Sequence, residues 1–169
     1  MTMNKFKERI LNKGRKAGAR IILPEHGDKR VKDAGDELTL LGFKIVHNED
    51  FQDHIDIYLD YINTLPFTEN WPVENLVEYL KNPLHYAMAM VACDDADGLV
   101  AGAVTPSGDV IRTAIRMIGI RPTSNNVSSI FFMISPEGEK AFTFSDCAVI
   151  PEPDSKQLAA IAAESAEFH

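Results

Sequence analysis

Apolar positions along this chain follow two patterns that alternate with each other. Short continuous apolar runs are typical of buried strands, and runs in which apolar side chains recur every three or four positions are typical of helices. The strands are expected at residues 19–24, 43–47, 99–103, 127–134 and 141–149. The helices are expected at residues 4–17, 28–41, 51–65, 72–81, 83–94, 110–118 and 154–167.

Local signals predict where several helices begin and end. Asp28 and Asp109 are acidic residues that can accept hydrogen bonds at a helix N-terminus, so each is expected to cap the helix that follows it. Pro72 and Pro83 stand where a first helical turn tolerates proline. Gly42 follows the second predicted helix, at a position where a glycine commonly ends one. Strands that alternate with helices in this way predict an α/β fold, with a mostly parallel sheet and helices on both faces.

Composition and charge narrow the classes of function. The chain has 169 residues, enough for one domain or for one domain and the start of another. Its net charge of −8 argues against nucleic acid as a partner. No apolar run approaches the roughly 20 residues that span a bilayer, so no membrane segment is expected. The two cysteines, Cys93 and Cys147, make no disulfide framework and indicate a reducing cytoplasm.

The basic residues are concentrated at one end of the chain. Eleven of the 17 lysines and arginines lie in residues 1–44, whereas residues 45–80 contain none and hold eight acids. The acidic stretch is either a solvated face or a region that would repel an anionic ligand, so a phosphate site is not expected there. The five histidines show no ligand spacing with each other or with the cysteines, and no metal site is expected.

The segment from Thr105 to Asp109 follows a predicted strand and opens a predicted helix. Backbone N–H groups at such a position can bind an anion. The hydroxyls of Thr105 and Ser107 add donors, and Gly108 allows a ligand to approach the backbone closely. The alternative interpretation is a capped connection between strand and helix that binds nothing.

Arg112 is expected at the third position of that helix. The helix dipole disfavours a cation there by about 0.3–1 kcal/mol, so an anion should offset the cost. That anion is either the carboxylate of Asp109, three residues earlier, or a bound phosphate.

Three segments together resemble one enzyme family. They run from Ala19 to Ala34, from Asp97 to Met133 and from Phe142 to Phe168, and they are similar to segments in the first half of the phosphate acetyl/butyryl transferases. The resemblance implies a first domain similar to the isocitrate/isopropylmalate dehydrogenase type. It places this domain at residues 1–126, and strands and a helix at residues 127–169, at the junction to a second domain that is absent.

The resemblance also implies a reaction and a site. The reaction is acetyl-CoA plus phosphate giving acetyl phosphate plus CoA, with coenzyme A as a substrate and with no resident cofactor or metal. Arg112 matches the family's active-site arginine, after an Asp-x-x step, and is expected to be catalytic. Phosphate or coenzyme A is expected to contact Thr105, Ser107, Gly108, Arg112 and Asp146.

Glu25 and Asp28, in a turn similar to one of the family, are expected to shape the fold, and a role for either as a catalytic base is the less favoured alternative. Cys147 is not expected to be a nucleophile, because no histidine is placed to activate it.

Other features of the family are missing from this sequence. A Ser-Arg pair and an aspartate belong to the family's second half, and residues 58–71 lack a basic residue that family members often have. The chain is therefore expected to be truncated, and inactive or weakly active alone. A non-catalytic module that binds acyl-CoA or acyl phosphate, and an assembly scaffold, are the alternatives. Because exposed sheet edges associate readily, a homo-oligomer or a complex with a complementary chain is expected.

Overall fold

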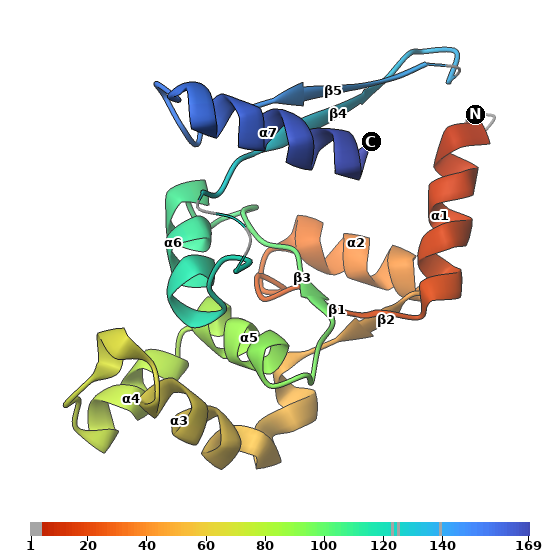
Figure 1. Cartoon of the computed structure of the whole chain (residues 1–169). Helices are drawn as coiled ribbons and strands as arrows, with labels where there is room; N and C mark the ends of the chain where they lie inside the picture. The colour runs from red at the N-terminus through yellow and green to blue at the C-terminus, as the bar shows by residue number, and fades with distance from the viewer. Residues whose placement is uncertain (1–4, 123, 125, 139) are drawn as a thin grey trace. The chain divides into compact units, whose positions relative to one another are not determined.

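The structure is a computed structural model that describes residues 5–122, 124, 126–138 and 140–169 (Figure 1). Residue 4, the predicted start of the first helix, lies outside them. The fold is α/β, as predicted, and the chain divides into two compact units. The larger unit is Lys13–Gly119, and the smaller one combines Met1–Asn12 with Ile120–His169. The predicted domain boundary after residue 126 stays a prediction.

A three-stranded parallel sheet lies at the centre of the larger unit, with the order β2-β1-β3. Its strands are β1 (Arg20–Ile22), β2 (Lys44–Val46) and β3 (Gly98–Leu99), all shorter than predicted. Ile21 lies opposite both Ile45 and Gly98 in the register. Asp97, just before β3, accepts both side-chain and backbone hydrogen bonds from Arg20 at the start of β1, and these contacts fix the two strand starts together.

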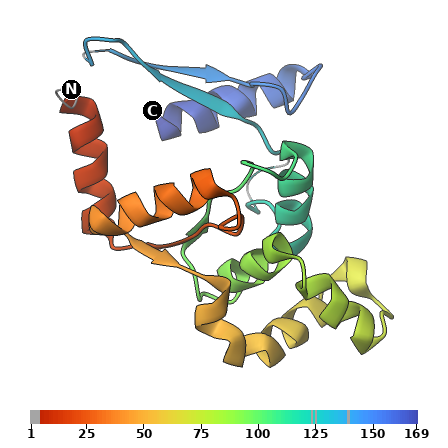
Figure 2. The same ribbon diagram turned by 180° about the vertical axis from the view of Figure 1, so that it is seen from behind.

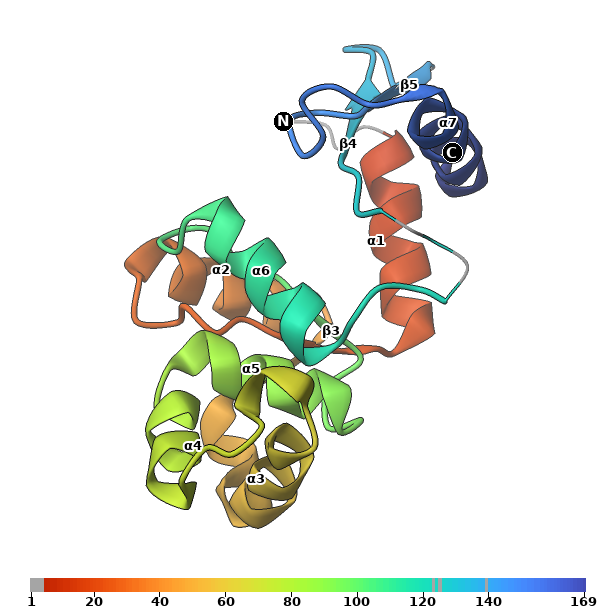
Figure 3. The same cartoon turned by 60° about the vertical axis from the view of Figure 1, so that its left-hand side comes forward.

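Helices cover both sides of this sheet. α2 lies on one side and α5 on the other (Figure 1, Figure 2). Next to α5, the helices α3 and α4 form a group with it, which Figure 3 shows from another direction. The α-helices that belong wholly to the larger unit are α2 (Lys29–Leu40), α3 (Ile55–Asn63), α4 (Val73–Leu80), α5 (Pro83–Ala92) and α6 (Ser107–Met117). Two 3₁₀ helices, η1 (Asn48–His54) and η2 (Pro66–Thr68), precede α3 and α4, and α1 (Lys5–Ala17) contributes residues to both units.

The core of the larger unit lies between the sheet and the helices α3 to α6. Apolar side chains at helical spacing meet there and lose nearly all contact with solvent. Tyr58 is among them, and its hydroxyl donates to Asp95 at 2.6 Å, which satisfies its one polar group. The largest apolar core side chains are Ile22, Tyr58, Ile62, Met90 and Met117.

Two predicted helix starts are wrong, because α3 begins at Ile55 and not at residue 51, and α6 begins before residue 110. Asp28 caps α2 by accepting a hydrogen bond from the amide of Arg30 at 2.9 Å. Asp109, in contrast, is not the cap of α6, which begins at Ser107 after Pro106. The carbonyl of Pro106 accepts from Asp109 at 2.9 Å and from Val110 at 3.2 Å, so the helix starts earlier than the acidic residue suggested. Arg112 is consequently the sixth helical residue, beyond the turn where the dipole acts most strongly on a charge.

The described part of the smaller unit is a two-stranded antiparallel ribbon with one C-terminal helix and the first part of α1. β4 (Ile130–Ile134) pairs with β5 (Ala141–Ser145), so the predominance of parallel pairing holds only for the larger unit. Phe132 on one face packs against Phe6 and against Phe168 of α7 (Ser155–Phe168). The other face carries two cross-strand pairs, Phe131 with Phe144 and Met133 with Phe142. All four of these side chains are about half exposed or more.

Among the described residues, no helix has both the length and the apolar character needed to cross a bilayer.

Candidate functional site

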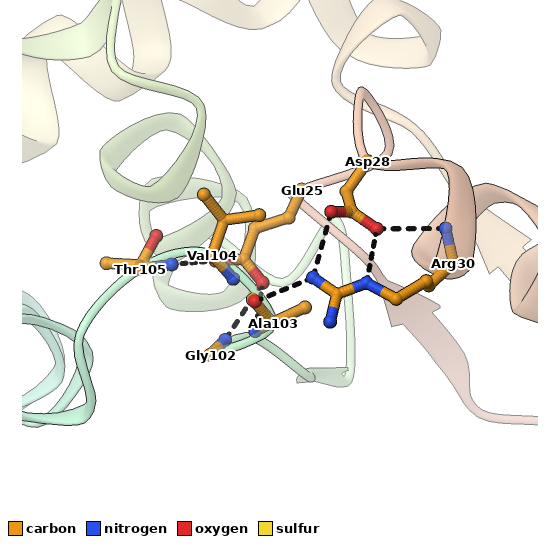
Figure 4. Close-up of polar contacts among 7 residues, drawn as sticks. All are labelled: Glu25, Asp28, Arg30, Gly102, Ala103, Val104 and Thr105. Atoms are coloured by element: carbon orange, nitrogen blue, oxygen red, sulfur yellow. Dashed lines mark hydrogen bonds and ion pairs between the residues drawn. The ribbon is translucent and has the colours of Figure 1, made fainter.

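A carboxylate is bound by four successive backbone amides at the C-terminal edge of the parallel sheet (Figure 4). The carboxylate belongs to Glu25, in the turn after β1. Its Oε2 accepts from the amides of Gly102 at 2.9 Å and Ala103 at 2.7 Å. Its Oε1 accepts from Val104 at 3.1 Å and Thr105 at 2.6 Å. Residues 102–105 therefore form an anion-binding turn, and the chain's own Glu25 supplies the anion.

Sheet topology explains why two segments so far apart in sequence meet. β1 and β3 are neighbouring parallel strands, so their C-terminal ends lie at the same edge. Glu25 follows the first strand and the 102–105 turn follows the second. Gly102 has φ +109°, a left-handed conformation that a side chain disfavours, and this lets the four amides converge on one point.

The electrostatics of Glu25 follow from these contacts. Burial of the carboxylate would raise its pKa, but the hydrogen bonds from residues 103–105 lower it to about 2. Glu25 is therefore charged at neutral pH. A carboxylate with this pKa is a poor general base near pH 7, so the structure favours the shaping role for Glu25 over the catalytic alternative.

An ion pair lies beside the 102–105 turn and is joined to it. Both Nε and Nη2 of Arg30 donate to the Asp28 carboxylate at 2.9 Å, and Nη2 also donates to the carbonyl of Ala103 at 3.0 Å. The side-chain hydrogen bond from Arg30 lowers the pKa of Asp28 to about 2. The guanidinium charge of Arg30 is thus already balanced by a neighbouring carboxylate.

An open cavity of about 350 Å³ adjoins this cluster within the larger unit. Apolar side chains of β1, α2 and the segment after β3 form most of its wall, and Glu25 and Arg30 form its polar end. The apolar residues that line it include Leu23, Val31, Ala34, Leu38 and Val100.

The predicted site residues of the larger unit lie at and after the 102–105 turn. The amide of Thr105 donates to Glu25, so it is not left for an outside anion. Ser107 and Gly108 form the exposed start of α6, and a Cβ placed at Gly108 would meet no described atom beyond its own helix backbone and chain neighbours within 4 Å. Arg112 donates through Nη1 to Asp109 Oδ1 at 2.5 Å, and both side chains are more than half exposed. The ion pair with Asp109 is therefore the arrangement that the structure contains.

Asp146 belongs to the smaller unit and organises the segment after β5. It accepts from the amide and hydroxyl of Ser129 at 2.6 and 2.7 Å. It also accepts from the amides of Val149 at 3.0 Å and Ile150 at 2.6 Å. These hydrogen bonds, led by the one from Ile150, hold the pKa of Asp146 well below its usual range. Asp146 is thus bound by backbone and hydroxyl donors of its own unit, and its role toward phosphate or coenzyme A stays a prediction.

The contact between Glu25 and the 102–105 turn was missed from the sequence. The available signal was indirect: Glu25 follows one predicted strand, and the 102–105 turn lies at the end of another. Nothing in the local sequence shows which carboxylate a set of amides will bind. Within the part of the chain that the structure describes, no three histidine, cysteine, aspartate or glutamate side chains are grouped so that they could hold a metal ion.

Comparison with known proteins assigns the chain to a family. The model of the phosphate acetyl/butaryl transferases matches residues 32–169. That span is most of the sequence, and it includes α6, Arg112 and Asp146. The chain therefore belongs to the phosphate acetyl/butaryl transferase family.

Individual relatives agree with this assignment. The chain is 31% identical over 189 residues to a phosphate acetyltransferase of Staphylococcus aureus, covering 98% of this chain and 56% of that enzyme. It is 30% identical over 184 residues to a phosphate acetyltransferase of Acetivibrio thermocellus, covering 93% of this chain and 55% of that enzyme. The chain thus spans about half the length of these curated relatives.

Solved structures show the same fold. The EutD phosphotransacetylase from Staphylococcus aureus superposes with a TM-score of 0.80 and 27% identity, over 95% of this chain and 56% of that one. A phosphotransacetylase from Streptococcus pyogenes superposes with a TM-score of 0.76 over 99% of this chain and 59% of that one. The latter is 22% identical and supports the fold alone.

Proposed function

We propose that this protein takes part in acyl transfer between coenzyme A and phosphate, and that the first turn of α6 contributes the anion site. Membership of the family supports the reaction class. The observation that carries the site is the exposed start of α6, where Ser107 and Gly108 precede a guanidinium one turn later. Gly108 and Arg112 are four residues apart and share one face of the helix, so backbone amides and a cation can meet one phosphate there.

This arrangement fits the charge changes of the reaction. In acetyl transfer to phosphate, the attacking oxygen of phosphate binds the acyl carbon and the CoA thiolate leaves. Phosphate must be held close to the thioester, and negative charge develops on the carbonyl oxygen and on the sulfur. Amide donors and a guanidinium stabilise such charge without a metal. In this chain, Ser107, Gly108 and Arg112 can hold the phosphate, with coenzyme A and acetyl phosphate as the other ligands.

We further propose that the 169-residue chain alone turns over slowly or not at all. Both arginines near the 102–105 turn are already neutralised, Arg30 by Asp28 and Arg112 by Asp109. A phosphate that binds at α6 competes with Asp109 for the guanidinium of Arg112. An exposed ion pair is worth about 0–1 kcal/mol, so this competition weakens phosphate binding modestly and adds to the slow turnover that we expect.

Self-association belongs to the same proposal. The exposed apolar face of the β4–β5 ribbon, made of Phe131, Met133, Phe142 and Phe144, favours a contact with a second copy or a complementary chain. A two-stranded ribbon is at best marginally stable in water unless its apolar faces are covered.

Cys93 and Cys147 are both free thiols, which supports a reducing compartment such as the cytoplasm.

An assay of CoA release from acetyl-CoA in the presence of phosphate tests the reaction. We expect turnover by the chain alone to fall below about 1 s⁻¹, the low end of typical enzyme rates. Calorimetric titration with phosphate and with coenzyme A should still detect binding at millimolar concentration. The Arg112→Ala variant should bind phosphate more weakly, and Arg116→Ala, on the same helix, is the matched control. An absence of both turnover and binding would reject the proposal.

A further inference from the structure

Glu25 joins two segments that are nearly 80 residues apart, through four backbone hydrogen bonds to its carboxylate. Four amides converge on its two oxygens at 2.6 to 3.1 Å. Because two oxygens accept from four donors, neither the Glu25 carboxylate nor the 102–105 backbone can move far without breaking a hydrogen bond. The 102–105 turn has no strand pairing of its own, so this carboxylate is the main polar contact that defines its conformation.

The position of α6 depends on this turn. Thr105, the last residue of the turn, is separated from Ser107 by Pro106 alone, and the backbone φ of Pro106 is fixed at −56°. A displacement of the turn is therefore passed directly to the first residues of the helix. The Arg30 guanidinium holds the same turn from its other side through the carbonyl of Ala103.

We propose that Glu25 is a positioning residue that acts as an internal anion, fixing the 102–105 turn and thereby the start of α6. It contacts no reacting atom in this role. Its link to phosphate, through Ser107 and Gly108, rests on the proposed function. The contact between Glu25 and the turn does not rest on the proposed function, so the contact and the link to phosphate can be tested separately.

An internal anion has a distinctive property: a small external anion can replace it. Truncation in Glu25→Ala removes the carboxylate and leaves four amides beside the open cavity that Glu25 lines. Formate carries the same carboxylate group and is small enough to enter. A side chain that acted only by filling space would not be replaced specifically by formate.

Hydrogen exchange at the amides of residues 102–105 tests the hold on the turn. Glu25→Gln keeps the shape of the side chain but replaces one acceptor oxygen with an NH₂ group, and Glu37→Gln on α2 is the control. Because hydrogen bonds to charged groups are strong, we expect exchange at the turn to be at least about tenfold faster in Glu25→Gln. Exchange in the core of α5 should change little, and Glu37→Gln should match the parent. Unchanged exchange at the turn in Glu25→Gln would overturn the proposal.

Chemical rescue separates an anion role from a packing role. We expect Glu25→Ala to have a lower melting temperature than the parent, and formate to restore part of that loss while chloride at equal ionic strength does not. Equal effects of formate and chloride would overturn the proposal. If Glu25→Ala does not fold, the exchange experiment on Glu25→Gln still tests whether the carboxylate holds the turn.

Phosphate titration of the same variants then tests the link to function. If Glu25→Gln loosens the turn and weakens phosphate binding severalfold, both proposals are supported. If it loosens the turn while the parent protein binds no phosphate, the positioning role stands and the proposed function fails. If phosphate binds the parent and Glu25→Gln equally, the positioning of α6 by Glu25 is refuted.

Discussion

The Arg112 guanidinium lies 2.5 Å from the carboxylate of Asp109, three residues earlier in the first turns of α6. Both side chains are exposed and belong to the same helix, so either can rotate away without disturbing the fold. The guanidinium of Arg112 is expected to bind phosphate. A phosphate at α6 would compete with the carboxylate of Asp109 for this guanidinium.

Removal of that competitor should strengthen phosphate binding. In Asp109→Asn, the guanidinium of Arg112 loses its ion-pair partner. The substitution also removes the negative charge of Asp109, which would repel phosphate. Exposed ion pairs are weak, so we expect phosphate affinity to rise by a factor of only about two to five. Isothermal titration with inorganic phosphate measures it. Asp33→Asn, which breaks an exposed pair with Lys29 on α2, is the control and should leave the affinity unchanged. A weaker affinity in Asp109→Asn would contradict the competition.

Two glycines near the site should respond differently to alanine. Gly102 has φ +109°, so Gly102→Ala strains the 102–105 turn and misaligns the amides that bind Glu25. We expect a loss of about 1–3 kcal/mol in the free energy of unfolding, measured by urea denaturation. Gly108 is helical and has open space around it, so Gly108→Ala should be neutral or slightly stabilising.

The same two variants test the anion site at α6. A methyl group at residue 108 would stand on the exposed first turn, where the proposed phosphate approaches. Gly108→Ala should therefore weaken phosphate binding although it preserves stability. If stability and binding change together in both variants, the distinction between the two glycines is wrong.

Stability should fall in acid over a window set by the lowered carboxylate pKa values. Glu25 has a folded-state pKa of about 2, below its ordinary value of 4.5, so the folded protein releases this proton more readily than the unfolded chain. A lowered folded pKa contributes stability above the unfolded value and loses it as the pH falls toward the folded value. The contribution of Glu25 to the free energy of unfolding should therefore be level above about pH 5 and decline between about 4.5 and 2.

The Glu25→Gln variant isolates one part of that decline. It should be less stable than the parent at pH 7, and the difference should shrink as the pH approaches 2, where the parent also loses the charge. Asp28 and Asp97, whose pKa values are likewise lowered to about 2, keep the rest of the decline in both proteins. Denaturation curves at several pH values check this, and a difference independent of pH would show that charge at residue 25 is not what stabilises the turn.

The exposed face of the β4–β5 ribbon should govern self-association. We expect light scattering to give a mass that is a multiple of 18.8 kDa for the parent chain. The double variant Phe131→Ser and Phe144→Ser removes one cross-strand aromatic pair and should shift the mass toward the monomer. Leu40→Ser is the matched control, because Leu40 is a single exposed apolar side chain on α2. A monomeric parent would remove the basis for this contact.

The sequence predicted the order of strands and helices because hydrophobic periodicity is a local property. It also predicted the cap at Asp28 from residue type alone. It misplaced the start of α6, since Pro106, whose carbonyl accepts the first hydrogen bonds of the helix, outweighed the preference of Asp109 for a capping position. Arg112 was predicted to pair with either Asp109 or a phosphate; the structure shows the ion pair with Asp109, and the role toward phosphate stays a prediction. The contact between Glu25 and the 102–105 turn depends on strand order, which no local pattern encodes.

A phosphate titration followed by amide NMR tests the central claim most directly. The account predicts saturable shifts at the amides of Ser107 and Gly108, weaker by severalfold in Arg112→Ala, with little change at the 102–105 amides that Glu25 already occupies. Shifts confined to other parts of the chain, or shifts of equal affinity in Arg112→Ala, would show that α6 does not bind the phosphate.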